Sequence, residues 1–256
     1  MKYLLKLRYV GTGFSGFQVQ PGKRTVQSSL GDAIEEIFKV RYDVKGCSRT
    51  DSGVHANVYF ATFDVPDKNS INITAEKLPF ALNSVLDNDI TVTGAKIVSD
   101  TFHVRHDVVS KEYVYIINCD KFRDPFEHNR AFFYPHQITD DMVEIMNKAG
   151  EIISGKHDFK CFMASGASVS DTCRDVKYIK AERTDENHLK IYACADGFLY
   201  NMVRIIAGTL LEAARGKITV SDIKNLLDSN DRTLAGPTLP ACGLYLNKVN
   251  FKNICI

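Results

Sequence analysis

Apolar residues recur with two different periods in the first hundred positions, and these periods predict the order of the secondary structure. Residues 4–10 and 90–98 alternate apolar with polar side chains, as half-buried strands do. Residues 26–38 place apolar side chains every three or four positions, which is typical of an amphipathic helix. The full expected order is β-α-β-β-α-β, at residues 4–10, 26–38, 44–45, 58–63, 75–86 and 90–98.

A similar order is expected after residue 110. We expect a strand at residues 113–117, a helix at 139–153 and two strands around a polar turn at 175–181 and 189–195. A long helix at 198–215 and a closing strand at 244–251 follow. Two copies of this order predict an α+β fold with two ferredoxin-like (split βαβ) halves side by side, a mainly antiparallel sheet and a cleft between the halves. The halves are expected to span residues 1–108 and 109–256.

One loop concentrates groups that could carry chemistry. Residues 46–56 read Gly-Cys-Ser-Arg-Thr-Asp-Ser-Gly-Val-His-Ala and lie between two expected strands. Two glycines and two serines around Arg49, Asp51 and His55 indicate a loop with unusual backbone dihedral angles. Loops held between rigid strands often carry function, so Asp51 is a candidate catalytic carboxylate. The same spacing also suits an ordinary turn over residues 51–53, and the pattern alone leaves both interpretations open.

The expected helix over residues 198–215 is apolar on nearly every face, which indicates a buried helix. Arg204 is expected near its middle, and Gly208, one turn further on, is expected to leave open space on the same face. A buried guanidinium without a partner is costly, so we expect an acidic group to meet it. Any carboxylate would serve in a structural ion pair. The alternative partner is Asp51, held ionised and oriented inside the cleft.

Three other features support weaker inferences. Tyr113 begins an alternating strand on the same face as Tyr115, and that pattern favours core packing. Three glycines in residues 11–16 suggest a flexible loop, but their spacing matches neither a Walker loop nor a dinucleotide-binding fingerprint. His103 and His106 could share a helical face. No cysteine or acidic residue stands at ligand spacing from them, so no metal site is predicted.

Composition and charge limit the classes of function. The 256 residues are 45% hydrophobic and 25% charged, which is the ordinary range for a globular protein. The net charge is +1, from 32 basic and 31 acidic residues, so the chain lacks the overall basic excess typical of nucleic-acid-binding proteins. An RNA site would therefore need a local concentration of Lys and Arg.

Cysteine usage and hydropathy indicate the compartment. The seven cysteines form no C-x-x-C pair and no secretory leader precedes them, which favours reduced thiols and argues against a structural zinc site. No apolar run approaches the length that spans a bilayer. We therefore expect a soluble cytoplasmic protein with no membrane or metal partner.

Residues 46–56 resemble the G-x-G-R-T-D-A-G-V-H-A signature of the TruA-type tRNA pseudouridine synthases. The R-T-D-x-G-V-H-A core is highly specific, and the resemblance extends along the whole chain. Weaker matches follow in the family order, at residues 16–18, 102–105, 111–115, 157–159, 201–204 and 243–246. The chain departs from the family pattern with Cys47 and Ser48 for Ala-Gly, Ser52 for Ala and Phe17 for Trp, which puts the fine substrate geometry in doubt.

The resemblance implies an isomerase that needs no cofactor and converts uridine to pseudouridine in the anticodon arm of tRNA, around positions 38 to 40. It implies a homodimer in which both subunits contact the RNA. Asp51 would be the catalytic carboxylate, adding to the base, adding to the sugar or removing a sugar proton. Tyr113 would stack on the uracil, and Arg204 would keep Asp51 ionised.

Arg49 and His55, in the same loop as Asp51, are candidate substrate-binding residues. Arg49 lies two residues before Asp51, so in extended backbone both side chains point the same way. Arg49 could then fill the space of a flipped nucleotide or grip its phosphate. His55 is expected to support the loop at the substrate-binding site.

Two other classes of function stay open at this stage. One is a non-catalytic RNA-binding protein of the same fold, against which the intact Asp51, Tyr113 and Arg204 argue. The other is a carboxylate-dependent hydrolase of a small molecule, which would normally need a second carboxylate. None stands near Asp51 in the sequence motif, although the fold could bring one there.

Overall fold

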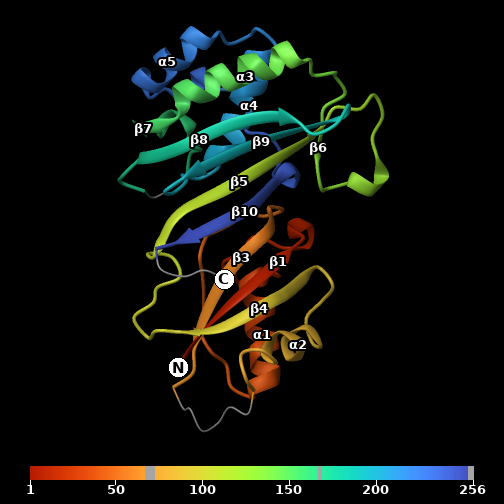
Figure 1. The fold of residues 1–256 in the computed structure, drawn as a ribbon, viewed down its shortest axis with the longest axis vertical. Helices are drawn as coiled ribbons and strands as arrows, with labels where there is room; N and C mark the ends of the chain where they lie inside the picture. The colour runs from red at the N-terminus through yellow and green to blue at the C-terminus, as the bar shows by residue number, and fades with distance from the viewer. Residues whose placement is uncertain (67–72, 167–168, 253–256) are drawn as a thin grey trace. The chain divides into compact units, whose positions relative to one another are not determined.

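The computed structural model describes residues 1–66, 73–166 and 169–252 (Figure 1). Its strands and helices form a mixed α+β fold with mainly antiparallel pairing, which confirms the predicted fold class. The chain divides into two compact units. The first unit is Met1–Val109 together with Leu246–Ile256, and the second unit is Ser110–Tyr245. The units differ from the expected halves in the last strand. Among the described residues, no helix is both long and apolar enough to pass through a bilayer.

The first unit follows the predicted β-α-β-β-α-β order. Its elements are β1 (Lys2–Tyr9), α1 (Val26–Phe38), β2 (Val44–Gly46), β3 (His55–Asp64), α2 (Leu78–Asn83) and β4 (Ile90–Val98). β1 pairs antiparallel with both β3 and β4, so Lys2 is the partner of Asp64 on one side and of Val98 on the other. β10 (Leu244–Phe251) lies next to β3, which gives the strand order β4-β1-β3-β10.

Helix α1 has the predicted bounds because its signals are local. Thr25 is the N-cap: its Oγ1 accepts a hydrogen bond from Ser28 N at 3.1 Å, while its own N–H donates to Ser28 Oγ at 3.1 Å. Lys39 has a left-handed backbone, with φ of 57°, and ends the helix. The buried residues of α1 lie on the predicted apolar stripe, among them Val26, Leu30 and Ile34.

Helix α2 is shorter than the predicted span of residues 75–86. It begins at Leu78 because Pro79 lacks an N–H and is tolerated only in the first turn. The Asn83 side chain exchanges two hydrogen bonds of 2.8 Å with the backbone of Val92, which fixes the end of α2 against β4. The proline signal was in the sequence, whereas the bond to β4 depends on the tertiary fold.

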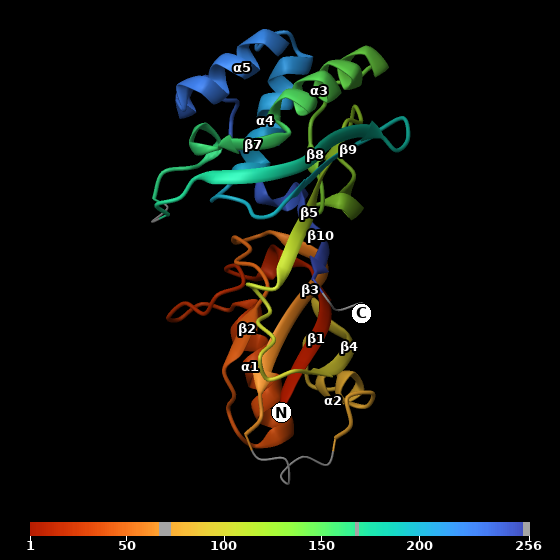
Figure 2. The same ribbon diagram turned by 60° about the vertical axis from the view of Figure 1, so that its left-hand side comes forward.

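The second unit contains the strand order β5-β9-β8-β7, and each neighbouring pair is antiparallel. These strands are β5 (Val108–Asn118), β7 (Gly155–Asp158), β8 (Cys173–Arg183) and β9 (His188–Ala195), and the short β6 (Phe132–Phe133) pairs parallel with β5. The helices α3 (Asp140–Ile153), α4 (Met202–Ala214) and α5 (Val220–Ser229) contact one another through α3, which also packs on β8 (Figures 1 and 2).

The second unit differs from the prediction in three elements. The helix expected over residues 198–215 begins only at Met202, because Asn201 has a left-handed backbone with φ of 59°. Helix α5 was not predicted, although Thr219 and Asp222 form a capping box before its apolar positions. The short strand β7 was also not predicted, since four residues carry too little periodicity to be recognised.

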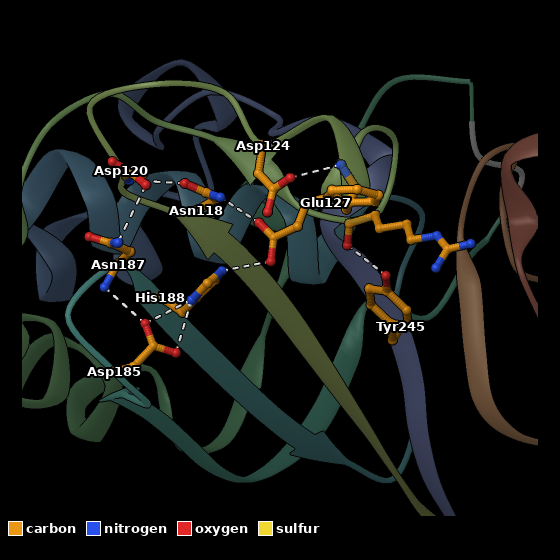
Figure 3. Close-up of polar contacts among 10 residues, drawn as sticks. Asn118, Asp120, Asp124, Glu127, Asp185, Asn187, His188 and Tyr245 are labelled. Carbon is orange, nitrogen blue, oxygen red and sulfur yellow. Dashed lines mark hydrogen bonds and ion pairs between the residues drawn. The ribbon is translucent and has the colours of Figure 1, made fainter.

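A network of polar side chains secures the end of β5, the strand that carries Tyr113 (Figure 3). Asn118, the last residue of β5, donates from its side chain to Glu127. Glu127 Oε1 lies 2.7 Å from His188 Nε2, and His188 Nδ1 lies 2.8 Å from Asp185 Oδ1. Burial alone would lower the pKa of His188, but its bonds to Asp185 and Glu127 outweigh burial and raise that pKa.

Replacing His188 by glutamine is expected to destabilise the protein more at low pH than at high pH. Because the folded pKa of His188 is raised, its stabilising contribution is complete below the unfolded pKa and is lost as pH rises through the folded pKa. We expect a difference in unfolding free energy of about 1 kcal/mol near pH 6 that shrinks toward about pH 9. Urea unfolding across this range measures the difference, with His128→Gln, an exposed histidine next to Glu127, as the control. A difference that grows with pH would contradict the assignment.

Candidate active site

The loop that carries Asp51 joins β2 to β3, and we call residues 47–54 the Asp51 loop. β2 pairs antiparallel with β3, with Val44 opposite Phe63 and Gly46 opposite Ala61. The pairing continues into the loop, since Cys47 N donates to Phe60 O at 2.9 Å and Phe60 N donates to Cys47 Sγ at 3.4 Å. The start of the Asp51 loop is therefore an extension of the sheet.

Two buried tyrosines bind the residues on either side of Arg49. The Tyr59 hydroxyl accepts from Ser48 N at 3.3 Å and donates to Ser48 O. The Tyr9 hydroxyl shares a hydrogen bond of 2.7 Å with Thr50 Oγ1. Tyr9 and Tyr59 are 4% and 0% exposed. Because both anchors are in the core, the loop has little freedom to move relative to its unit.

The glycine-rich segment at residues 11–16 packs directly against the Asp51 loop. Phe17 N donates to Thr50 O at 3.0 Å, and Gly53 N donates to Phe14 O at 3.3 Å. A Cβ on Gly11 would lie 2.0 Å from Val54 O, and a Cβ on Gly16, whose φ is +86°, would lie 2.7 Å from Thr50 O. These two glycines thus permit close backbone approach to the Asp51 loop.

Asp51 is half-buried and begins a tight turn. Its carbonyl oxygen accepts from Val54 N at 3.1 Å, and Gly53 supplies the left-handed backbone with φ of 79°. The Ser52 hydroxyl donates to Phe14 O at 3.3 Å. The bond from Val54 N closes the turn through backbone atoms. An ordinary turn and a catalytic carboxylate are therefore compatible at this position.

Arg49 and His55 occupy contrasting environments in the same loop region. Arg49 is exposed, whereas the first residue of β3, His55, is 0% exposed. His55 Nδ1 accepts a hydrogen bond from Gly11 N at 3.0 Å, which ties β3 to the glycine-rich segment. This geometry fits the support role expected for His55, and its contribution to substrate binding stays a prediction.

Tyr113 lies in the second unit, in the middle of β5. It is 7% exposed and pairs across the sheet with Ala193 of β9. Its ring stands edge-on to Phe198, with centroids 5.2 Å apart and an interplanar angle of 90°. Phe198 lies outside α4, so the loop before that helix, and not the helix itself, supplies the aromatic neighbour.

The neighbouring Glu112 is a buried acid that the sequence analysis did not single out. It is 4% exposed and accepts a hydrogen bond from the Tyr178 hydroxyl. Burial, followed by the bond to Glu112, raises the pKa of Tyr178, so the hydroxyl stays protonated and donates. The alternation of β5 placed Glu112 on the face opposite Tyr113, but nothing local indicated that this face is also covered.

Arg204 differs from its expected setting in two respects. It is the third residue of α4 and not in the middle of a helix, and it is half-buried and not buried. Its Nε donates to Leu239 O at 2.6 Å and its Nη1 donates to Asn201 Oδ1 at 2.6 Å. These partners hold the guanidinium in a defined direction without requiring an acidic partner.

Gly208 also differs from expectation, because the space beside it is filled. A Cβ at this position would lie 2.0 Å from Pro237 O, so the glycine allows the segment after α5 to pack against α4. The sequence pattern indicated that a small residue is needed here, but it predicted open space where the backbone of Pro237 lies.

The candidate residues therefore belong to two different units. Arg49, Asp51 and His55 lie in the first unit, while Tyr113 and Arg204 lie in the second. The pairing of Asp51 with Arg204 stays a prediction. In the described part of the chain, no group of three or more His, Cys, Asp and Glu side chains is placed to hold a metal ion.

Comparison with known proteins gives consistent matches. The family profile described as tRNA pseudouridine synthase matches residues 7–107 and 149–252. The tRNA pseudouridine synthase A of Bacillus subtilis (strain 168) is 41% identical over 255 residues, covering 99% of this chain and 100% of the relative. That of Thermoanaerobacter sp. (strain X514) is 43% identical over 246 residues, covering 96% and 98%. A chain of the crystal structure of a Cbf5-Nop10-Gar1 complex aligns over 97% of this chain and 59% of its own length, with 11% identity and a TM-score of 0.38.

Proposed function

This chain belongs to the tRNA pseudouridine synthase family, and we propose that Asp51 is the carboxylate with which it isomerises uridines around positions 38 to 40 of the anticodon arm. The enzyme is an isomerase that converts uridine to pseudouridine in tRNA. The observation that carries the assignment of Asp51 is the R-T-D stretch on a loop anchored from both sides by core tyrosines. Such preorganisation is what a catalytic carboxylate needs.

The reaction rearranges bonds without gaining or losing atoms. The bond between N1 of uracil and C1′ of ribose breaks, the base turns, and a bond from C5 to C1′ forms. The hydrogen on C5 is released as a proton and N1 gains a proton, so no oxidant or reductant is needed. Asp51 can serve this sequence by adding to the base, by adding to the sugar or by removing a sugar proton.

The other candidate residues have complementary roles in this proposal. Tyr113 stacks on the uracil and accepts the C5 proton, and its pairing with Ala193 of β9 holds its backbone in place. Arg204 favours the ionised form of Asp51. Arg49, exposed two residues before Asp51, fills the space of the extruded nucleotide or binds its phosphate. Together these contacts offset the few kcal/mol needed to unstack a base.

We also propose that the enzyme acts in the cytoplasm as a homodimer. A dimer gives one tRNA contacts with two copies of a chain whose overall charge is only +1.

The position of the modified uridine is tested with tRNA transcripts that carry tritium at C5 of uridine. We expect the purified protein to release tritium from a transcript with uridines at positions 38, 39 and 40. Replacing these three by cytidine is expected to reduce release to background, because the proposal confines the reaction to these positions. Reverse-transcription mapping after carbodiimide treatment locates the product. Release that persists in the triply substituted tRNA would overturn the assignment to the anticodon arm and leave the isomerase activity standing.

A further inference from the structure

A hollow of about 300 Å³ opens in the first unit beside the Asp51 loop. Three separate stretches of the chain supply its basic side chains: Lys45 from β2, Arg49 from the Asp51 loop, and His103, Arg105 and His106 from the turn after β4. We call it the basic hollow. Its volume lies at the lower end of the range of about 300–1,000 Å³ for ligand pockets, so it suits a single small group.

The basic hollow concentrates positive charge in a protein that has almost none overall. Asp43 is the one acidic residue in its described lining, and it lies 4.0 Å from Lys45 at the limit of an ion pair. Among the residues that the structure describes, no carboxylate comes within ion-pair distance of Arg49 or Arg105. Surface arginines usually find an acidic partner or solvent, and two of them facing one hollow indicate an anion site.

The histidines show the effect of this charge. Burial, followed by the charges of His106, Lys45 and Arg105, lowers the pKa of His103, and Asp107 only partly opposes them. The rings of His103 and His106 lie 4.1 Å apart between centroids. The groups that face the hollow therefore repel added positive charge, and a bound anion would relieve that repulsion.

The turn that carries these residues is rigid. His103 N donates to Asp107 Oδ2 at 2.8 Å, and His103 Nδ1 accepts from Arg105 N and His106 N at 3.3 Å each. Because Nδ1 is an acceptor, the neutral ring carries its hydrogen on Nε2 and keeps a donor for a ligand. Phe102 and Val104 alternate with the basic residues and are buried, Phe102 against Phe251 at 5.4 Å between centroids.

We propose that the basic hollow binds one backbone phosphate of the tRNA substrate, at a site separate from the Asp51 carboxylate. The proposal rests on the proposed function, since tRNA is the polyanion that this enzyme must hold. Guanidinium, ammonium and imidazole donors from three stretches suit the tetrahedral oxygens of a phosphodiester better than the flat edge of a base. Arg49 lines the hollow and lies two residues before Asp51, so the seated phosphate would belong to a nucleotide near the target uridine.

The test uses the full chain with Asp51→Ala, so that tRNA binding is measured without turnover. In that background, the double variant Lys45→Gln/Arg105→Gln is expected to raise the Kd for an unmodified tRNA transcript about tenfold. It is also expected to reduce the slope of log Kd against log salt by about 0.7–0.9 for the lost phosphate contact. The matched control, Lys77→Gln/Lys96→Gln, removes two exposed lysines of the same unit and is expected to change neither quantity by as much.

A second arm identifies the ligand. We expect one methylphosphonate near the target uridine to weaken binding to the Asp51→Ala protein and to have no further effect on the double variant. Inorganic phosphate at constant ionic strength is expected to compete only weakly, and strong competition would overturn RNA as the specific occupant. In the protein with Asp51 intact, neutralising Lys45 and Arg105 is expected to raise KM and leave kcat within about twofold.

The outcomes separate this proposal from the proposed function. If the wild-type protein releases tritium and the double variant binds tRNA with unchanged Kd and salt slope, the basic hollow is not a phosphate site. If binding weakens as expected but the wild type releases no tritium, the phosphate site stands and the proposed reaction fails. Thermal unfolding of each variant shows whether the fold is retained. In the Asp51→Ala background, a single Arg105→Lys variant keeps the charge, so its Kd for tRNA is expected to stay close to that of the Asp51→Ala protein.

Discussion

Replacing Asp51 by alanine is expected to reduce pseudouridine formation by at least about 10³-fold, which corresponds to about 4 kcal/mol of transition-state stabilisation. The three roles open to Asp51 all need a carboxylate, as a nucleophile toward the base or the sugar or as a base toward a sugar proton. A methyl group can perform none of them. Single-turnover tritium release, with enzyme in excess over tRNA, measures this loss without interference from product release.

The loss is expected to be specific to chemistry because the Asp51 loop is closed through its backbone. The bond from Val54 N to Asp51 O and the bonds from Tyr9 and Tyr59 do not involve the Asp51 side chain. Because these bonds remain, the alanine variant should keep its fold, which thermal unfolding checks. It should bind tRNA at least as well, since a negative charge near the phosphates is gone. Glu36→Ala, which removes an exposed carboxylate from α1, is the control for charge and should leave the rate unchanged. A rate for Asp51→Ala within tenfold of wild type would remove Asp51 from the catalytic role.

Elements with local signals could be predicted closely from the sequence. The bounds of α1 agree because its capping box, its apolar stripe and its left-handed end are all encoded within fifteen neighbouring residues. β4 agrees in its bounds because residues 90–93 alternate apolar with polar side chains. By contrast, the start of α4 depends on the left-handed backbone of Asn201, which the continuous apolar pattern from Phe198 concealed. Hydrophobic periodicity indicates which residues are buried, and Leu199 is buried although it lies before the first residue of α4.

The candidate site residues come from a local sequence signal, whereas the groups that support them do not. The R-T-D stretch, within eleven consecutive residues, is enough to propose roles for Asp51 and Arg49, and these roles stay predictions. The anchors Tyr9 and Tyr59 could not be found in this way, because hydroxyls that bond to residues 41 and 11 positions away leave no local pattern. The same limit applies to the basic hollow, whose cations come from three stretches that only the fold brings together.

Replacing Arg204 by methionine is expected to lower kcat by about 10²-fold, the usual effect of removing one preorganised charge-stabilising donor. Leu239 O and Asn201 Oδ1 already orient the guanidinium through Nε and Nη1. Among the described residues of the second unit, Nη2 has no hydrogen-bond partner, so it is available to an anion. If that anion is the Asp51 carboxylate, methionine of similar length removes the charge that keeps it ionised.

The pH dependence distinguishes this role from a structural one. Without the guanidinium, the catalytic carboxylate takes up a proton at higher pH, so the acidic limb of the kcat/KM profile should move to higher pH in Arg204→Met. A structural role would lower stability by about 1 kcal/mol, through the lost bonds to Leu239 and Asn201, and would leave that limb in place. Arg204→Lys keeps the charge but not the planar fork, so it should lose less activity and show a smaller movement. A wild-type acidic limb in Arg204→Met, whatever its kcat, would show that Arg204 does not face the catalytic carboxylate.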